Sequence, residues 1–124
     1  MKSYKDLVVW QKSMSLVTEI YKITRSFPKE EMYGLVYQIR RCAISIASNI
    51  AEGYGRQSTT DYVRYLQISR GSLYELQTQL EVCVNIKYVN KSDYNNLSQL
   101  SDEIGKMLNI LIKKVKESKK GIRH

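Results

Sequence analysis

The sequence predicts an all-α fold, an antiparallel up-down-up-down four-helix bundle that forms one domain over residues 1–124. Its 124 residues include one proline and six glycines, so few positions force a helix to stop. These turn residues fall between four segments in which apolar residues recur at steps of three and four, the spacing of helices that share a core. Because the connections are short, neighbouring helices are expected to run antiparallel.

The first helix is predicted from Asp6 to Arg25. It ends before Phe27-Pro28, because a residue that precedes proline is pushed out of the helical region. One of its apolar stripes has heptad spacing and is predicted to face the core of the bundle. This stripe consists of Leu7, Trp10, Met14, Val17 and Tyr21.

The same helix carries a second apolar stripe, so its apolar arc is roughly 200° wide, twice the usual width. Either the helix lies deep inside its own bundle, or the second stripe contacts another subunit. Because only three other helices are available to cover it, we favour an oligomer interface. Ten tyrosines agree with this choice, since tyrosine is enriched at interfaces, although tyrosines also stack on nucleobases. The predicted interface residues are Val9, Leu16, Ile20 and Ile23.

The second helix is predicted to begin at Pro28 and to end at Gly53 and Gly55. Glu30 and Glu31 carry charges that suit the positive end of a helix. Its apolar face is predicted to join the core. That face consists of Met32, Leu35, Ile39, Cys42, Ala43, Ile46 and Ile50.

The opposite face of the second helix carries a polar stripe with the same helical spacing. Its side chains are suited to hydrogen bonds along or across helices, which predicts a structural network at a subunit contact. The alternative is a row of donors for a phosphate backbone. Because Glu52 opposes the two arginines, we favour the structural role. The stripe consists of Gln38, Arg41, Ser45, Asn49, Glu52 and Arg56.

The third helix is predicted to begin with a capping box, Ser58-Thr59-Thr60-Asp61, and to end near Lys87. Ser92 is the predicted cap of the fourth helix. Both helices carry one apolar stripe for the core. The stripes are Tyr62, Leu66, Ser69, Leu73, Leu76, Leu80 and Cys83 in the third helix and Leu97, Leu100, Ile104, Leu108, Leu111 and Val115 in the fourth.

The residue inventory argues against an enzyme. His124 is the only histidine, so the residues for a His-based metal site or nucleophilic triad are missing. Cys42 and Cys83 fall on apolar helix faces, where a free thiol behaves as a small hydrophobe. Gly53-Tyr54-Gly55 follows a helix instead of linking a strand to a helix, so it is not a phosphate-binding loop. We expect no catalytic residue, no metal and no cofactor.

The net charge of +8 is concentrated at the two ends of the chain. A basic tail is predicted from about residue 116, and lysine and arginine there are suited to a polyanion, although solvated basic tails are also common. The N-terminus lacks an apolar signal segment, and no apolar run has membrane-spanning length, so we expect a cytoplasmic protein without a membrane partner. The candidate nucleic-acid contacts are Lys113, Lys114, Lys116, Lys119, Lys120 and Arg123.

Several motifs together closely resemble the bacterial four-helix-bundle proteins encoded in intervening sequences of 23S ribosomal RNA genes. Tyr4 stands where that family often has Phe. The resemblance implies a ring-shaped homopentamer and kinship with the accessory variability determinant of diversity-generating retroelements, which binds nucleic acid and partners a reverse transcriptase. It supplies no catalytic residues. The motifs are Asp6-Leu7-Val8-Val9-Trp10, Phe27-Pro28, Tyr33-Gly34-Leu35, Gln38-Ile39-Arg40-Arg41, Ser45-Ile46, Asn49-Ile50-Ala51-Glu52-Gly53, Gly55-Arg56, and Gly71-Ser72 followed by Glu75-Leu76.

The leading hypothesis is therefore a non-enzymatic, oligomeric protein that binds nucleic acid, RNA above all, electrostatically and with weak sequence selectivity. A ring that repeats one basic surface multiplies weak phosphate contacts into useful avidity. The alternative is a structural or adaptor protein that recruits a protein partner, such as a reverse transcriptase, through the ring.

Overall fold

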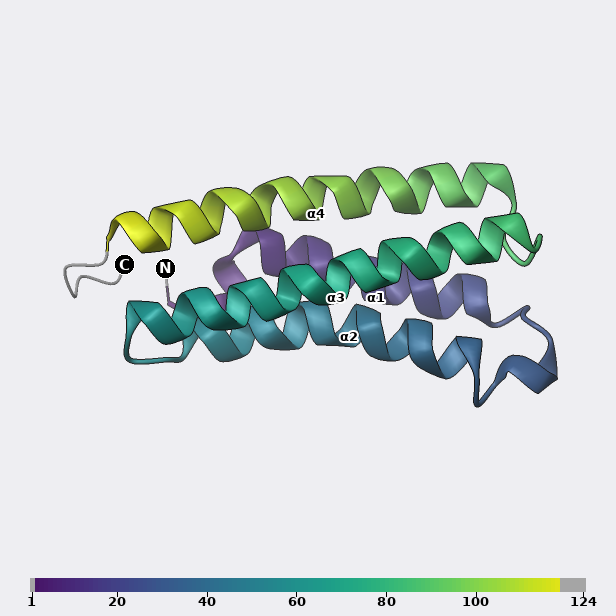
Figure 1. Ribbon diagram of the computed structural model, residues 1–124, viewed down its shortest axis with the longest axis horizontal. Helices are drawn as coiled ribbons and strands as arrows, with labels where there is room; N and C mark the ends of the chain where they lie inside the picture. Colours follow the sequence, from purple (N-terminus) through teal and green to yellow (C-terminus); the bar gives the residue numbers. More distant parts are fainter. Residues whose placement is uncertain (1, 119–124) are drawn as a thin grey trace.

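The computed structural model describes residues 2–118 and confirms the predicted fold class for them (Figure 1). Successive helices run in opposite directions, so the order is up-down-up-down. Two short 3-10 turns precede the first two helices. The elements are η1 (Tyr4–Asp6), α1 (Val8–Thr24), η2 (Lys29–Glu31), α2 (Leu35–Tyr54), α3 (Thr59–Asn85) and α4 (Lys91–Glu117).

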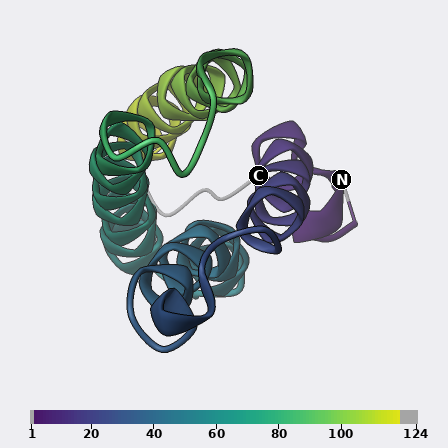
Figure 2. The same ribbon diagram turned by 90° about the vertical axis from the view of Figure 1, so that its right-hand side faces the viewer.

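Viewed along the bundle axis, the four helices follow one another in sequence order around that axis (Figure 2). Each helix packs on its neighbours in sequence, and α1 also packs on α4, which closes the bundle. The contact between α2 and α3 is the most extensive. The start of α1, the α2–α3 connection and the end of α4 lie at one end, which we call the α2–α3 end (Figure 1). Among the described helices, none combines the length and apolar character required to cross a bilayer.

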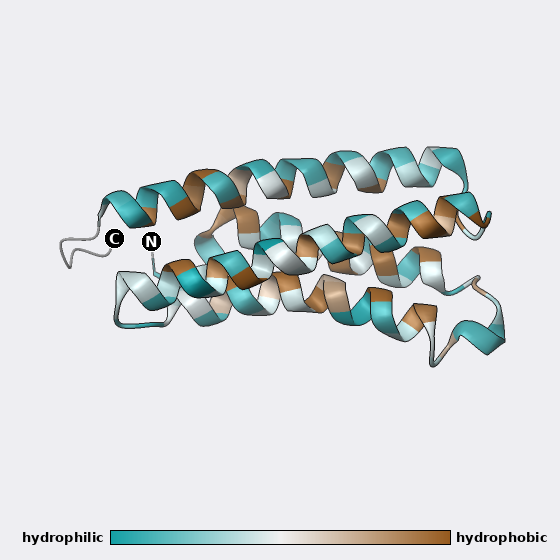
Figure 3. Cartoon of the chain, in the orientation of Figure 1, coloured by the Kyte–Doolittle hydropathy of each residue, from teal (hydrophilic) through white to brown (hydrophobic). Residues whose placement is uncertain are grey.

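Side-chain caps set the starts of the two long helices. Ser58 Oγ accepts a hydrogen bond from the Asp61 backbone N–H at 3.1 Å, which confirms Ser58 as the cap of α3, although the reciprocal bond from the Asp61 side chain that completes a capping box is not formed. The predicted cap of α4 is wrong by two residues. Asn90 Oδ1 accepts from the Asp93 N–H at 2.7 Å, so Asn90 takes the place expected for Ser92. Helix α4 begins with hydrophilic residues, and hydrophobic residues are interspersed with hydrophilic ones farther along it (Figure 3).

The prediction that the second helix begins at Pro28 is also wrong. Pro28 precedes only η2, and α2 begins seven residues later at Leu35. Glu31 joins this connection to the rest of the bundle, because one carboxylate oxygen accepts from the Leu35 N–H at 3.4 Å and the other accepts from Tyr88 Oη at 3.0 Å. The hydrogen bond to Glu31 also raises the pKa of Tyr88, since it favours the protonated phenol.

The prediction that Val9, Leu16 and Ile20 form an oligomer interface is wrong. All three are buried in the core of the single chain, and Ile23 packs half-buried against that core. Helix α1 therefore turns this stripe into the core of its own bundle.

The other stripe of α1, which the sequence assigned to the core, is partly exposed. Met14 and Tyr21 are exposed, and Trp10 and Val17 are half-buried; only Leu7 is buried. The buried face includes Ser13, whose hydroxyl donates to the Val9 carbonyl at 2.7 Å. Because this hydroxyl bonds to its own helix, a polar residue inside the apolar face costs little.

A close contact between α2 and α3 explains Gly53. The helix ends at Tyr54 with Gly55 as its cap, so Gly53 lies inside α2 and not after it. A Cβ atom at Gly53 would lie 2.9 Å from Tyr65 Cβ and 3.2 Å from the Tyr62 carbonyl oxygen. Glycine at this position lets the two backbones approach.

The two cysteines are buried free thiols in the core. Burial raises the pKa of Cys83 to about 11, because the apolar surroundings disfavour the thiolate. Burial also raises the pKa of Cys42. Both thiols therefore stay protonated at neutral pH and fill space in the core.

We predict opposite stability effects for alanine at two glycines. Gly53→Ala should lower the free energy of unfolding by about 1–3 kcal/mol, because the added methyl group meets α3. Gly71→Ala is the matched control. Gly71 lies inside α3 with no atom within 4 Å of an added Cβ, so this change should raise stability by about 0.5–1 kcal/mol. Urea unfolding followed by circular dichroism measures both, and a neutral Gly53→Ala would contradict the close contact.

Candidate nucleic-acid interface

The positive charge of the described chain gathers at the α2–α3 end. The half of the bundle at this end comprises residues 2–15, 45–71 and 105–118 and has ten Lys and Arg residues against four Asp and Glu. The opposite half, residues 16–44 and 72–104, has seven against eight. We call the first half the basic end. Its cations are Lys2, Lys5, Lys12, Arg56, Arg64, Arg70, Lys106, Lys113, Lys114 and Lys116.

The last turns of α4 present three of the predicted contact residues. Lys113, Lys114 and Lys116 are exposed, and none of them forms an ion pair with another described residue. The core nevertheless reaches this end of the helix, because Val115 is fully buried. Helix α4 continues to Glu117, beyond the predicted start of the tail. The other predicted contacts, Lys119, Lys120 and Arg123, lie outside the described residues.

A groove between α3 and α4 brings Lys116 together with the first turns of α3. It has a volume of about 570 Å³ and is lined by Thr59, Thr60, Val63, Arg64, Gln67 and Lys116. The Arg64 guanidinium lies 3.9 Å from Asp61 and 4.9 Å from the centre of the Tyr65 ring. Two cations and two hydroxyls in one groove provide hydrogen-bond donors for phosphate oxygens. Arg64 was not among the predicted contact residues, because only the packing of α3 on α4 places it near Lys116.

Two residues of the polar stripe form a hydrogen-bonded network between α2 and α3. Ser45 Oγ lies 2.8 Å from Ser72 Oγ, and Asn49 Nδ2 donates to the Ser45 carbonyl at 2.8 Å and to its hydroxyl at 3.0 Å. The sequence predicted a structural network at a subunit contact. Its partner, however, is α3 of the same chain, so these bonds need no second subunit.

The remaining stripe residues do not join that network. Arg56 pairs with Glu52, donates to Tyr65 Oη at 2.8 Å, and lies 4.7 Å from the centre of the Tyr65 ring. Gln38 and Arg41 are exposed and form no hydrogen bond or ion pair with the described part of the chain. The structural role of Arg41 at a subunit contact therefore stays a prediction, because Arg41 faces solvent in the single chain.

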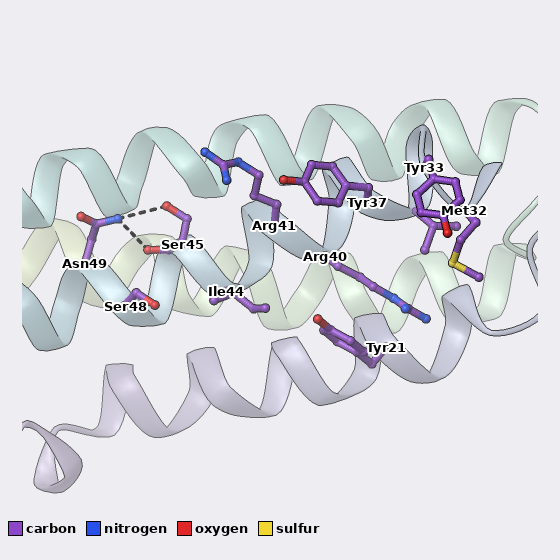
Figure 4. A pocket seen from close by; sticks show the side chains of 11 residues that line it. Tyr21, Met32, Tyr33, Tyr37, Arg40, Arg41, Ile44, Ser45, Ser48 and Asn49 are labelled. Atoms are coloured by element: carbon purple, nitrogen blue, oxygen red, sulfur yellow. Dashed lines mark hydrogen bonds between the residues drawn. The ribbon is translucent and has the colours of Figure 1, made fainter.

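A second groove, which we call the tyrosine–arginine groove, runs along α2 beside the end of α1 (Figure 4). It has a volume of about 650 Å³. Arg40 is fixed in it, because its Nε donates to Thr24 Oγ1 at 2.9 Å and its guanidinium lies 4.4 Å from the centre of the Tyr21 ring. Its lining residues are Tyr21, Met32, Tyr33, Val36, Tyr37, Arg40, Arg41, Ile44, Ser45, Ser48 and Asn49.

An apolar groove between α1 and α2 continues from the tyrosine–arginine groove toward the basic end. Both are lined by Ile44 and Ser48. Met14 and Ile44 remain 41% and 43% exposed there. Small side chains form the floor of this groove, because alanine and serine recur along this part of α2. The apolar groove is lined by Tyr4, Trp10, Met14, Val17, Ile44, Ala47, Ser48 and Ala51.

Within residues 2–118, no group of three or more His, Cys, Asp or Glu side chains is placed to hold a metal ion. The three grooves instead offer cations, hydroxyls, tyrosine rings and apolar side chains. Side chains of these kinds are suited to contacts with a ligand or with a partner molecule.

Comparison with known proteins places the chain in a family. Residues 5–110 match the family model described as 23S rRNA-intervening sequence protein. The chain belongs to this family. A crystal structure of a protein with unknown function from the S23 ribosomal protein family of Bacteroides thetaiotaomicron VPI-5482 has a TM-score of 0.79 and 29% identity, covering 86% of this chain and 96% of that one. No curated protein matches the chain.

We predict different stability effects for two residues of the polar stripe. Ser45→Ala should lower the free energy of unfolding by about 1 kcal/mol, because Ser72 and Asn49 each lose a hydrogen-bond partner. Arg41→Ala should change it by less than about 0.5 kcal/mol, as expected for an exposed side chain. Denaturant titration of both variants measures the difference in the free energy of unfolding. A larger decrease for Arg41→Ala would show that Arg41 does contribute to a structural network.

Proposed function

We propose that this member of the 23S rRNA-intervening sequence protein family is a non-enzymatic, oligomeric protein that binds nucleic acid, RNA above all, through its basic end. The observation that carries the proposal is the concentration of positive charge in one half of the bundle. Phosphate contacts supply nearly all of the affinity in binding that ignores sequence. The basic end offers flexible lysine and arginine side chains that can contact phosphates whatever the base sequence, so binding should be weakly selective.

The unpaired lysines of α4 carry most of this proposed contact. Lys113, Lys114 and Lys116 have no carboxylate partner among the described residues, so their charge is available to a polyanion. Arg56 contributes less, because Glu52 already neutralises it. Arg64 extends the surface from α4 onto α3 through the groove that it shares with Lys116.

We propose the apolar groove as the contact with a second copy of the chain. An exposed apolar patch of this kind marks an interaction surface, and its small floor lets another helix approach closely. The apolar groove replaces Val9, Leu16 and Ile20 as the proposed oligomer contact, because these three residues are buried within the single chain. A contact between unlike faces, repeated around a closing rotation, gives a ring such as the homopentamer that the resemblance implies. Each ring would repeat the basic end and raise its avidity.

The kinship that the sequence resemblance implies supports the same proposal. The accessory variability determinant of diversity-generating retroelements binds nucleic acid and partners a reverse transcriptase. A reverse transcriptase is accordingly a candidate protein partner, and its gene beside this one would favour that pairing.

The second candidate function is an adaptor that recruits a protein through the ring. The exposed tyrosines and apolar side chains on α1 and α2 favour it, since such residues are common at protein interfaces. In that case the basic end would serve solubility alone, and no nucleic acid would bind even at low salt.

We predict that neutralising the end of α4 weakens binding and reduces its salt dependence. Lys113→Gln, Lys114→Gln and Lys116→Gln together should reduce the slope of log affinity against log salt by about 2–3 for each engaged subunit, since each phosphate contact contributes about 0.7–0.9. Fluorescence anisotropy with labelled RNA and duplex DNA at several salt concentrations measures the slope.

The matched control removes three lysines from the opposite half of the bundle. Lys22→Gln, Lys29→Gln and Lys91→Gln together change the net charge by the same amount and should leave most of the slope intact. An equal reduction of the slope in both triple variants would show that binding depends on net charge and not on the position of the lysines. Absence of binding by the wild-type protein at low salt would favour the adaptor.

We predict that a charge in the apolar groove disrupts the oligomer. Ile44→Glu should yield a smaller species with unchanged helicity, because a carboxylate buried at the contact would lack a partner. Thr78→Glu adds the same charge at an exposed polar position of α3 and should keep the wild-type size. Sedimentation velocity and circular dichroism provide the two measurements, and a monomeric wild-type protein at micromolar concentration would contradict the proposed assembly.

A further inference from the structure

We propose that the tyrosine–arginine groove is a stacking site for the bases of single-stranded nucleic acid. This inference rests on the proposed function and deepens it by naming a strand form and a second contact surface. The basic end contacts phosphates, which single strands and duplexes share. Tyrosine rings contact base faces, which are available only where bases are unstacked.

The exposed rings lie where α2 begins. Tyr37 and Arg41 are one helical turn apart on the same side of α2, about 6 Å apart along its axis, and Tyr33 lies just before the helix (Figure 4). The Tyr33 side chain is 93% exposed and that of Tyr37 is 53% exposed. Neither tyrosine has a hydrogen-bond or ring partner among residues 2–118, so both rings present faces to a ligand.

The charges of the groove select an anionic ligand. Two guanidinium groups, those of Arg40 and Arg41, lie in it, and no carboxylate is among its lining residues. Arg40 is held in place by Thr24 and the Tyr21 ring, so little side-chain freedom is lost when it meets a phosphate. Aromatic rings beside two cations match a chain in which flat bases alternate with phosphates.

The same charges argue against a second copy of the chain in this part of the surface. Covering Arg40 and Arg41 with an apolar partner would remove water from two cations that no lining side chain neutralises. The neighbouring apolar groove carries neither arginine and so remains the proposed subunit contact.

The test compares a labelled oligothymidylate with a duplex of equal length, using the full chain. For Tyr33→Ala and Tyr37→Ala together, we expect the affinity for the single strand to fall by about 25-fold or more, because each stacked base contributes at least about 5-fold. The affinity for the duplex should change by less than about two-fold, since the basic end is intact.

Two control variants separate stacking from general effects. Tyr33→Phe with Tyr37→Phe keeps both rings and should bind the single strand as the wild type does. Tyr74→Ala removes a tyrosine of α3 that is 53% exposed, as Tyr37 is, and lies outside the groove, so it should bind normally. Circular dichroism verifies folding. If the double alanine variant unfolds, Tyr33→Ala alone should still lower single-strand affinity by about 5-fold.

Three results would overturn the inference while leaving the proposed function intact. These are unchanged single-strand binding by the double alanine variant, equal losses for single strand and duplex, or a changed sedimentation coefficient, which would make the groove a subunit contact. If the wild-type protein binds neither probe at low salt, the proposed function fails and this inference fails with it. Binding of an acidic peptide in preference to the oligothymidylate would also overturn it.

Discussion

The rotation of α1 about its own axis determines which surfaces this bundle exposes. Leu16 and Ile20 are directed into the core, and burying two large aliphatic side chains contributes roughly 1.5–3 kcal/mol each. This orientation places Trp10, Met14 and Tyr21 on the side of the helix that faces α2 and solvent. Both the apolar groove and the tyrosine–arginine groove depend on that choice.

The contact between α2 and α3 is the most extensive contact between helices in the described structure. Gly53 removes the side chain that would separate the helices, and the hydroxyls of Ser45, Ser69 and Ser72 satisfy one another or the backbone within the contact. Buried polar groups stabilise a fold only when they are paired, and these are paired within one chain. The exposed residues of α2 therefore lie on a helix that packs closely against α3.

The three grooves divide the surface by chemistry. Lys116 and Arg64 meet where α4 ends and α3 begins, whereas Arg40 and Tyr37 lie near the start of α2. Between them, Met14 and Ile44 line a surface without charge. The proposed phosphate, base and subunit contacts therefore centre on three different grooves, of which the last two share Ile44 and Ser48 at their border.

Helical periodicity determined much of this protein from the sequence alone. The all-α class, the four segments, the Ser58 cap and the core stripe from Tyr62 to Cys83 follow from local spacing and from the cost of unpaired helix ends. Periodicity could not decide which of the two stripes of α1 faces the core, because both have helical spacing. Only the positions of α2 and α4 in the tertiary structure decide that Leu16 is buried. The same limit applies to Arg64 and Lys116, and to Tyr21 and Arg40. These pairs are distant in the chain, so tertiary packing alone brings them together.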